Sequence, residues 1–350
     1  MNSRERVLTA CAFERPDRIP RFDGFWEYPE SWQERFGSPD GLSDISIWVP
    51  DETSNPLGAR LIKEEGGDYY YVDSWGHTKR SRPGAYFEEY IKALIPLGVD
   101  PDSVQFDSPT LDARYLGGCK DETEFNIKLD EGKSKWCVFG KTGGPYLRTT
   151  FVRGEAQFLI DIAEDPELAK ALADKVGDHI TAVGVEEIKR WKLQDTGIFI
   201  YDDMAYNDNP FFSPKSFEKV FLPAYRRMIK AYKEAGAKYV FLHSDGNIRP
   251  ILDMLIDAGI EGLNPLERRA KMDPFEIRKT YPKVVLTGGM CNSHTLINGP
   301  IEKIVREAKE LIDLGKDGGV VIGTHSVSPE VPIEHFAAYH ETCLTYGNFE

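Results

Sequence analysis

Residues 238–267 read KYVFLHSDGNIRPILDMLIDAGIEGLNPLE, and this stretch decides the fold. It begins with an apolar run over 238–242, passes through the polar turn HSDGN, and continues as an amphipathic segment over 249–258. A second apolar run over 262–266 follows. A strand, a helix and another strand in this order predict two parallel strands joined by a helical crossover.

The same alternation extends along the chain on both sides of this stretch. Further strands are expected at 44–48, 136–139, 196–200, 284–287 and 320–323, and further helices at 165–191, 214–236, 273–280, 300–314 and 332–346. Repeated strand–helix units in a chain of 350 residues fit a (β/α)8 TIM-type barrel, which typically needs about 250 residues and tolerates insertions. We expect one such domain over 1–350, with a β-hairpin inserted near 69–80, where the sequence reads YYYVDSWGHTKR.

The composition excludes several classes of protein. The chain has 43 Lys+Arg against 57 Asp+Glu, and a formal charge of −14 argues against nucleic-acid binding. No apolar run approaches the roughly 20 residues of a membrane helix, so no membrane span is expected. The first residues contain no apolar signal core and the five cysteines form no CxxC pair, so we expect a cytoplasmic protein with reduced thiols.

Barrel enzymes build their active sites where the strands end, so the polar residues after each predicted strand are the candidates. These residues are Asp51, Asp202, Asp203, His243, Asp245, Glu267, Cys291, His294 and His325. Asp202 and Asp203 can equally cap the loop that follows them, because aspartate favours turns. The sequence does not decide whether Cys291 and His294 belong to the site.

The sharpest set among these candidates is His243, Asp245, Glu267 and His325. The spacing of His243 and Asp245 puts both side chains on the same side of an extended segment. Two imidazoles with carboxylates can hold a tetrahedral Zn²⁺ that keeps one position for substrate or water. The same groups can instead perform metal-free acid–base chemistry, with Asp203, Glu267 and His325 as the candidate catalytic residues.

Other conspicuous motifs predict no site. KTGGP at 141–145 lacks the spacing of a phosphate-binding loop and is expected to be a turn. No GxSxG motif occurs. The remaining histidines lie in predicted hairpin or helix contexts and are expected to have structural or surface roles: His77, His179, His335 and His340.

Several motifs, taken in order, resemble the uroporphyrinogen decarboxylase superfamily. They are RERVLTACAFERPDRIPR, GGPYLRTTFVRG, FSPKSFEKVFLPAYRRMI, HSDGNIRPILDMLIDAGIEGLNPLE, LTGGM and THSVSPEVPIEHF, and they extend from about Arg4 to Gly347. The resemblance implies a single (β/α)8 barrel, in agreement with the alternation, and a fold that often forms a homodimer. It also implies one of two chemistries, decarboxylation of a tetrapyrrole or methyl transfer involving a corrinoid.

The decarboxylases of this family carry an arginine-rich stretch, R-Q-A-G-R-Y, that holds the carboxylates of the substrate. The matching run here is RFDGFW, so one arginine remains as Arg21 and the second matches Phe25. The family's tyrosine matches Thr150, its aspartate matches Asp51 and its C-terminal histidine matches His325. The candidate substrate-binding residues, in a pocket that has lost carboxylate-binding groups and gained aromatic ones, are Arg21, Phe25, Trp26, Asp51, Thr150 and Asp202.

The branch that methylates coenzyme M holds zinc with an H-x-C motif and a later cysteine. Here H-x-C becomes His243-Ser244-Asp245 and the later cysteine matches His325, so harder N and O donors replace both thiolates. Such donors suit polarising an oxygen better than activating a thiol. The resemblance therefore implies a zinc-assisted methyltransferase that moves a methyl group from a methoxylated small molecule, such as a methoxyarene, to the Co(I) corrinoid of a partner protein. A decarboxylase-like carboxy-lyase and a non-catalytic small-molecule-binding barrel are the alternatives.

Overall fold

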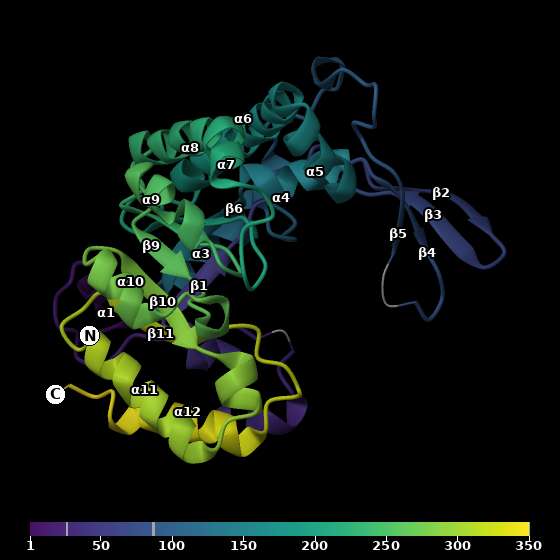
Figure 1. Cartoon of the computed structure of the whole chain (residues 1–350). Helices are drawn as coiled ribbons and strands as arrows, with labels where there is room; N and C mark the ends of the chain where they lie inside the picture. Colours follow the sequence, from purple (N-terminus) through teal and green to yellow (C-terminus); the bar gives the residue numbers. More distant parts are fainter. Residues whose placement is uncertain (26, 86–87, 350) are drawn as a thin grey trace.

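A computed structural model describes residues 1–25, 27–85 and 88–349 of the chain (Figure 1). At its centre is a sheet in the order β1-β6-β7-β8-β9-β10-β11, in which every neighbouring pair is parallel. The strands are β1 (Ile45–Trp48), β6 (Cys137–Gly143), β7 (Gly197–Tyr201), β8 (Tyr239–His243), β9 (Gly262–Asn264), β10 (Val285–Met290) and β11 (Val320–Thr324). This order confirms the predicted strand–helix barrel.

Residues 20–24, called the closing segment here, join the two edge strands of this sheet. Phe22 N donates to Ile322 O of β11 at 2.9 Å, and on the other side Asp44 N donates to Arg21 O at 2.8 Å, next to β1. The closing segment therefore takes the place of an eighth strand. The sequence pattern missed it because its polar and aromatic residues form no apolar run.

Alternate residues of the strands point into the barrel and pack its interior. This layer is apolar and buried: Ile45, Phe139, Phe199, Phe241, Val285 and Val321. Helix α1 (Ser3–Cys11) covers the amino-terminal end of the barrel, where Val7 and Cys11 join the same cluster. Because strand side chains alternate, the next inward positions lie two residues further along each strand, toward the opposite mouth.

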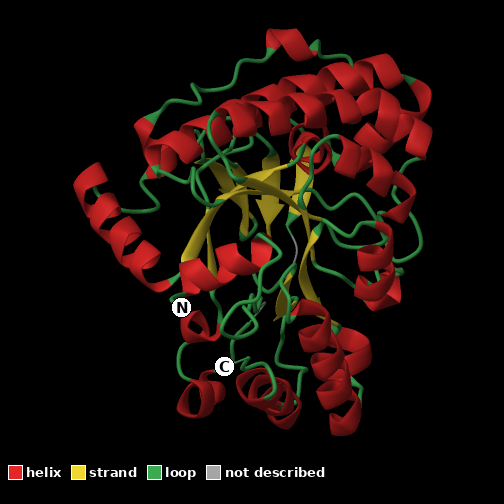
Figure 2. Cartoon of the chain, turned by 90° about the vertical axis from the view of Figure 1, so that its left-hand side faces the viewer, coloured by secondary structure: helices red, strands yellow, loops and turns green. Residues whose placement is uncertain are grey.

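An outer ring of helices surrounds the strands (Figure 2). It consists of α4 (Pro145–Arg153), α5 (Glu155–Glu164), α6 (Pro166–Arg190), α7 (Pro214–Val220), α8 (Leu222–Glu234), α9 (Arg249–Asp257), α10 (Pro274–Thr280), α11 (Ile301–Gly315) and α12 (Ile333–Thr345). The single helix expected over 214–236 is broken between α7 and α8, because Pro223 lacks the N–H that a continuous helix requires. None of the described helices is both long and apolar enough to cross a membrane.

The long connection between β1 and β6 carries a second sheet, with strands β2 (Arg60–Glu65), β3 (Asp68–Val72), β4 (Thr78–Ser81) and β5 (Glu89–Lys92). The strands follow one another in chain order, and each neighbouring pair is antiparallel. The hairpin expected near 69–80 corresponds to β3 and β4. Figure 1 shows this sheet extending away from the barrel. The remaining elements are the helix α3 (Glu122–Lys135) and the short α2 (Gln33–Phe36), η1 (Glu30–Trp32), η2 (Pro39–Leu42), η3 (Pro101–Ser103), η4 (Asp112–Tyr115), η5 (Arg268–Ala270) and π-helix η6 (Asn292–Ile297).

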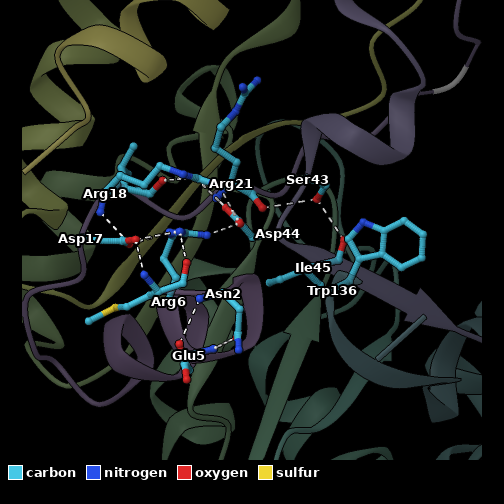
Figure 3. Close-up of polar contacts among 12 residues, drawn as sticks. Asn2, Glu5, Arg6, Asp17, Arg18, Arg21, Ser43, Asp44, Ile45 and Trp136 are labelled. Atoms are coloured by element: carbon cyan, nitrogen blue, oxygen red, sulfur yellow. Dashed lines mark hydrogen bonds and ion pairs between the residues drawn. The ribbon is translucent and has the colours of Figure 1, made fainter. Parts of the chain in front are cut away.

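A buried carboxylate, Asp44, ties α1, the closing segment and β1 together (Figure 3). It accepts hydrogen bonds from Arg6 Nη1 at 2.9 Å, from Arg18 Nη1 and Nη2 at 2.8 Å each, and from Arg21 N at 2.9 Å. Asp17 binds the other side of the Arg6 guanidinium, with Nε at 2.6 Å. The Asp44 side chain is only 2% exposed, so its partners neutralise it out of contact with water.

Helix α6 is attached to the loop after β1 through His179. Its Nε2 lies 3.2 Å from Glu52 O and 3.3 Å from Thr53 O, and because carbonyl oxygens only accept, this nitrogen carries the proton. Burial, together with the nearby Arg114 guanidinium, lowers the pKa of His179 to about 4. The folded protein therefore holds a neutral imidazole where the unfolded chain titrates near 6.5.

Replacing Asp44 with Ala is expected to lower the free energy of unfolding by about 3 kcal/mol, because Arg6 and Arg18 lose a buried counter-charge. Urea denaturation measures the change. Asp195→Ala is the matched control, since Asp195 pairs with Arg4 at 2.8 Å but its side chain is 79% exposed. This surface pair is expected to contribute about 0–1 kcal/mol. Equal losses in the two variants would contradict the role assigned to Asp44.

His179 is expected to make the protein less stable in mild acid. Its folded pKa lies below its unfolded value, so its contribution is complete above pH 6.5 and is lost as the pH falls toward 4. His179→Gln keeps an N–H donor but cannot titrate. Between pH 6.5 and 5.5 the wild type should lose about 1 kcal/mol more unfolding free energy than this variant. Parallel pH profiles of the two proteins would show that His179 does not titrate as proposed.

Candidate active site and metal centre

Two strand ends on different sides of the barrel bring His243, Asp245 and His325 together. His243 is the last residue of β8, Asp245 lies two residues beyond it, and His325 follows β11 directly. One ligand atom from each of the three lies within 4.8 Å of the others. Asp245 Oδ1 is 3.3 Å from His325 Nε2 and 3.8 Å from His243 Nε2. The three residues form a cluster in which all the donors are nitrogen or oxygen.

Asn264, at the end of β9, fixes the orientation of the His243 ring. Asn264 Nδ2 donates to Thr287 O at 3.2 Å, which turns Asn264 Oδ1 toward His243 Nδ1 at 2.5 Å. An amide oxygen only accepts, so Nδ1 carries the imidazole proton and Nε2 keeps its lone pair. That lone pair faces the cluster, as a metal ligand or a proton acceptor requires.

Two more carboxylates lie beside the cluster. Asp203 Oδ1 accepts a hydrogen bond from Asp245 N at 3.0 Å and is 3.9 Å from His243 Nε2. Glu267 Oε2 accepts from Gly246 N at 3.2 Å, and its Oε1 is 3.4 Å from Arg269 Nε. Asp245 Oδ1 is itself buried without a hydrogen-bond partner in the described part of the chain. Neither of these carboxylates provides a hydrogen-bond partner for Asp245 Oδ1.

Burial opposes charge throughout this group. Burial and the neighbouring carboxylates of Asp203 and Glu267 together raise the pKa of Asp245 to about 7. Burial also lowers the pKa of His243 and of His325. At neutral pH the imidazoles are neutral and Asp245 is poised to release or take a proton. A divalent cation would replace that proton and balance the carboxylates.

The side of the site toward β6 and β7 contains two residues that the sequence did not single out. The Tyr201 ring stacks on the His243 ring, with centroids 4.0 Å apart and planes 8° from parallel. Lys141 Nζ lies 3.9 Å from the centroid of the Tyr201 ring. The expected turn at 141–145 is wrong in part, because Lys141 continues β6 as the next inward residue after Phe139. Extending the alternation of that strand by one step would have found it.

Asp202 does not join the cluster. It is fully buried, and its oxygens accept hydrogen bonds from Leu147 N at 2.6 Å, Tyr146 N at 3.2 Å and Tyr225 Oη at 2.6 Å. It therefore holds the first turn of α4, where the amide groups lack helical partners. The sequence offered Asp202 as a substrate contact or as a cap of the loop that follows it, and in the structure it caps α4 instead.

Arg21 and Thr150 also face other parts of the fold. Arg21 Nη2 pairs with Asp23 at 2.6 Å, its Nη1 is 2.9 Å from His340 Nδ1, and its guanidinium lies over the Tyr339 ring of α12. Thr150 Oγ1 donates to a carbonyl oxygen within its own helix, α4. Their present contacts secure helices and do not reach the cluster.

The remaining candidates that the structure describes do not belong to the three-residue cluster. Phe25 packs edge-on against Tyr28 and Phe336, and Trp26 lies outside the described residues. Asp51 Oδ1 accepts from Thr53 N at 3.0 Å and so shapes the turn after β1. Cys291 is buried before η6 and His294 is exposed within it, and neither belongs to the three-residue cluster.

Comparison with known proteins agrees with this barrel. Residues 126–346 match the family model described as uroporphyrinogen decarboxylase (URO-D). This match spans more than half of the chain, and the protein belongs to that family. A solved structure of a methyltransferase from Methanosarcina mazei shares the fold with a TM-score of 0.64 at 17% identity, over 99% of both chains.

Two curated relatives carry the name methylcobamide:CoM methyltransferase MtaA. The protein from Methanosarcina barkeri is 30% identical over 214 residues, which are 49% of this chain. The one from Methanosarcina barkeri strain Fusaro / DSM 804 is 24% identical over 214 residues. The match spans 60% of the length of each relative.

Proposed function

We propose that the protein is a methyltransferase that moves a methyl group from a methoxylated small molecule, such as a methoxyarene, to the Co(I) corrinoid of a partner protein. The observation that carries the proposal is the cluster of two neutral imidazoles and one carboxylate at the barrel mouth. The names of the M. barkeri relatives support methyl transfer involving a corrinoid. A donor set without thiolate supports an oxygen compound, not a thiol, as the small-molecule substrate.

The residues present fit a zinc ion. Asp245 Oδ1 is buried and unpaired in the described residues, and it points between two imidazole nitrogens. His243, Asp245 and His325 would hold the ion, whereas Glu267, also expected as a ligand, is outside this three-residue group. Zinc would supply a Lewis acid for the oxygen that loses its methyl group.

The chain's own groups account for the proton that this oxygen requires. A phenolate has a conjugate-acid pKa of about 10, so near neutral pH it leaves more easily when a proton or positive charge stabilises it. Asp245, with its pKa raised to about 7, can donate that proton without a metal, and His325 lies 3.3 Å from it to return one. Asp203 and Glu267 hold the backbone around Asp245 in position.

The decarboxylase alternative has less support. Binding several carboxylates requires cations that point into the site. Arg21 is engaged by Asp23 and His340, and Phe25 packs against other aromatic rings. A barrel that only binds a ligand would not explain why three carboxylates and two imidazoles gather at one mouth at such electrostatic cost.

The metal centre is expected to bind one equivalent of Zn²⁺ and to depend on the orientation of His243. Asn264→Leu removes the acceptor for His243 Nδ1 and should weaken Zn²⁺ binding about 10- to 100-fold. Competition with a chromophoric chelator measures the affinity. His294→Ala is the control, because His294 is exposed and lies outside the cluster, and it should leave the affinity unchanged. Equal affinities of Asn264→Leu and wild type would argue against this ligand set.

Methyl transfer is tested with free cob(I)alamin as the acceptor and 4-methoxybenzoate or its neutral amide, 4-methoxybenzamide, as the donor. The visible spectrum should change to that of methylcobalamin with the wild type and with His294→Ala, but not with His243→Ala. Full activity of chelator-treated protein would refute the zinc role and leave Asp245 or His325 as the proton donor. Formation of coproporphyrinogen from uroporphyrinogen, without any methyl transfer, would overturn the proposed function.

A further inference from the structure

Lys141 places a positive charge inside the barrel, within reach of the site. Phe139, two residues before Lys141 on β6, belongs to the packed apolar layer. Because strand side chains alternate, Lys141 is the next inward residue toward the mouth. Glu187 Oε1 accepts a hydrogen bond from Lys141 N at 3.0 Å, which fixes the backbone there. The Nζ, the Tyr201 ring and the His243 ring follow one another across β6, β7 and β8, at 3.9 Å and 4.0 Å.

The ammonium group of Lys141 has no carboxylate partner. Within the described ranges its Nζ makes no ion pair and donates no hydrogen bond; it lies over the face of Tyr201, and the carboxylates of Glu52 and Asp203 attract it only from a distance. The neighbouring carboxylate of Glu52 already binds Arg148 Nη2 at 2.5 Å and accepts from Gly143 N at 2.6 Å. Asp203 accepts from Asp245 N. The nearby Arg148 guanidinium is thus paired with Glu52, whereas none of the described carboxylates forms an ion pair with Lys141.

We propose that Lys141 binds a negatively charged group of the small-molecule substrate, a carboxylate or a sulfonate, and so makes the enzyme selective for anionic methyl donors. The inference rests on the proposed function for the identity of that substrate. An ammonium has three donors, and a ring face occupies only one side of it, so an anion can take the rest. A charge-assisted hydrogen bond contributes more than a neutral one, and it is absent when the ligand is neutral.

A purely structural role explains less. A half-buried lysine that served only packing would keep its charge in water or pair it with the protein. Burial lowers the pKa of Lys141, as expected for a charge without a close partner. Lys133 offers a contrast, because it is also half-buried with a lowered pKa, yet its Nζ donates to Trp191 O at 2.5 Å and Lys192 O at 3.2 Å. Lys133 is satisfied by the protein, and Lys141 is left for a ligand.

The test compares the binding of three ligands of one shape to zinc-loaded protein by calorimetry: 4-methoxybenzoate, 4-methoxybenzenesulfonate and the neutral 4-methoxybenzamide. Lys141→Met should weaken binding of at least one of the two anions roughly 10- to 100-fold and leave the amide within about twofold. Comparing the two anions distinguishes a carboxylate from a sulfonate site. Lys141→Arg keeps the charge and should retain part of the affinity. Lys133→Met should bind all three ligands like the wild type.

The proposal would be overturned if the wild type bound neither anion more tightly than Lys141→Met does. Equal weakening of the anions and the amide would do the same, because it would show a loss of shape and not of charge. Binding needs no corrinoid, so the result is independent of methyl transfer. Charge-dependent binding without methyl transfer would refute the proposed function alone, and equal methyl transfer from neutral and anionic donors would refute this inference alone.

Discussion

The hydrogen bonds of the closing segment hold the barrel shut, and the site depends on that closure. In a flat sheet, β8 and β11 would stand three strand spacings apart, about 14 Å. In the closed barrel the rings of His243 and His325, carried by the ends of these strands, have centroids 5.4 Å apart. Asp44 secures the closing segment from the amino-terminal end, far along the strands from the cluster that it helps to form.

The alternation of strand side chains sorts the interior into layers. The lowest layer is apolar and packed, the next holds Lys141, Tyr201 and His243, and the mouth holds the carboxylates. The apolar layer beneath these polar groups offsets the free-energy cost of burying them, because it excludes water and fixes the strands. The same layer makes isolated charges costly, which is why burial shifts the pKa values of the imidazoles and of Asp245.

The sequence predicted the periodic parts of this protein well. Apolar runs marked the strands of the parallel sheet, and the H-x-D spacing marked His243 and Asp245 as a pair. It failed where tertiary contacts decide. The closing segment acts as a strand because it hydrogen-bonds to β11 on one side and next to β1 on the other. Asp202 caps α4 because the end of β7 lies beside the first turn of that helix. Arg21 was expected at the substrate, and the structure shows it paired with Asp23 of the closing segment and 2.9 Å from His340 of α12.

The sheet β2–β5 lies in the connection between two strands that are direct neighbours. β1 pairs with β6 from Ile45 and Cys137 onward, so the register of the barrel is set without reference to the residues between them. That connection leaves β1 at the mouth and returns to β6 through α3. The length of the β2–β5 sheet can therefore vary without changing the pairing of β1 with β6. An insertion or deletion in that sheet would leave His243, Asp245 and His325 on the same strand ends.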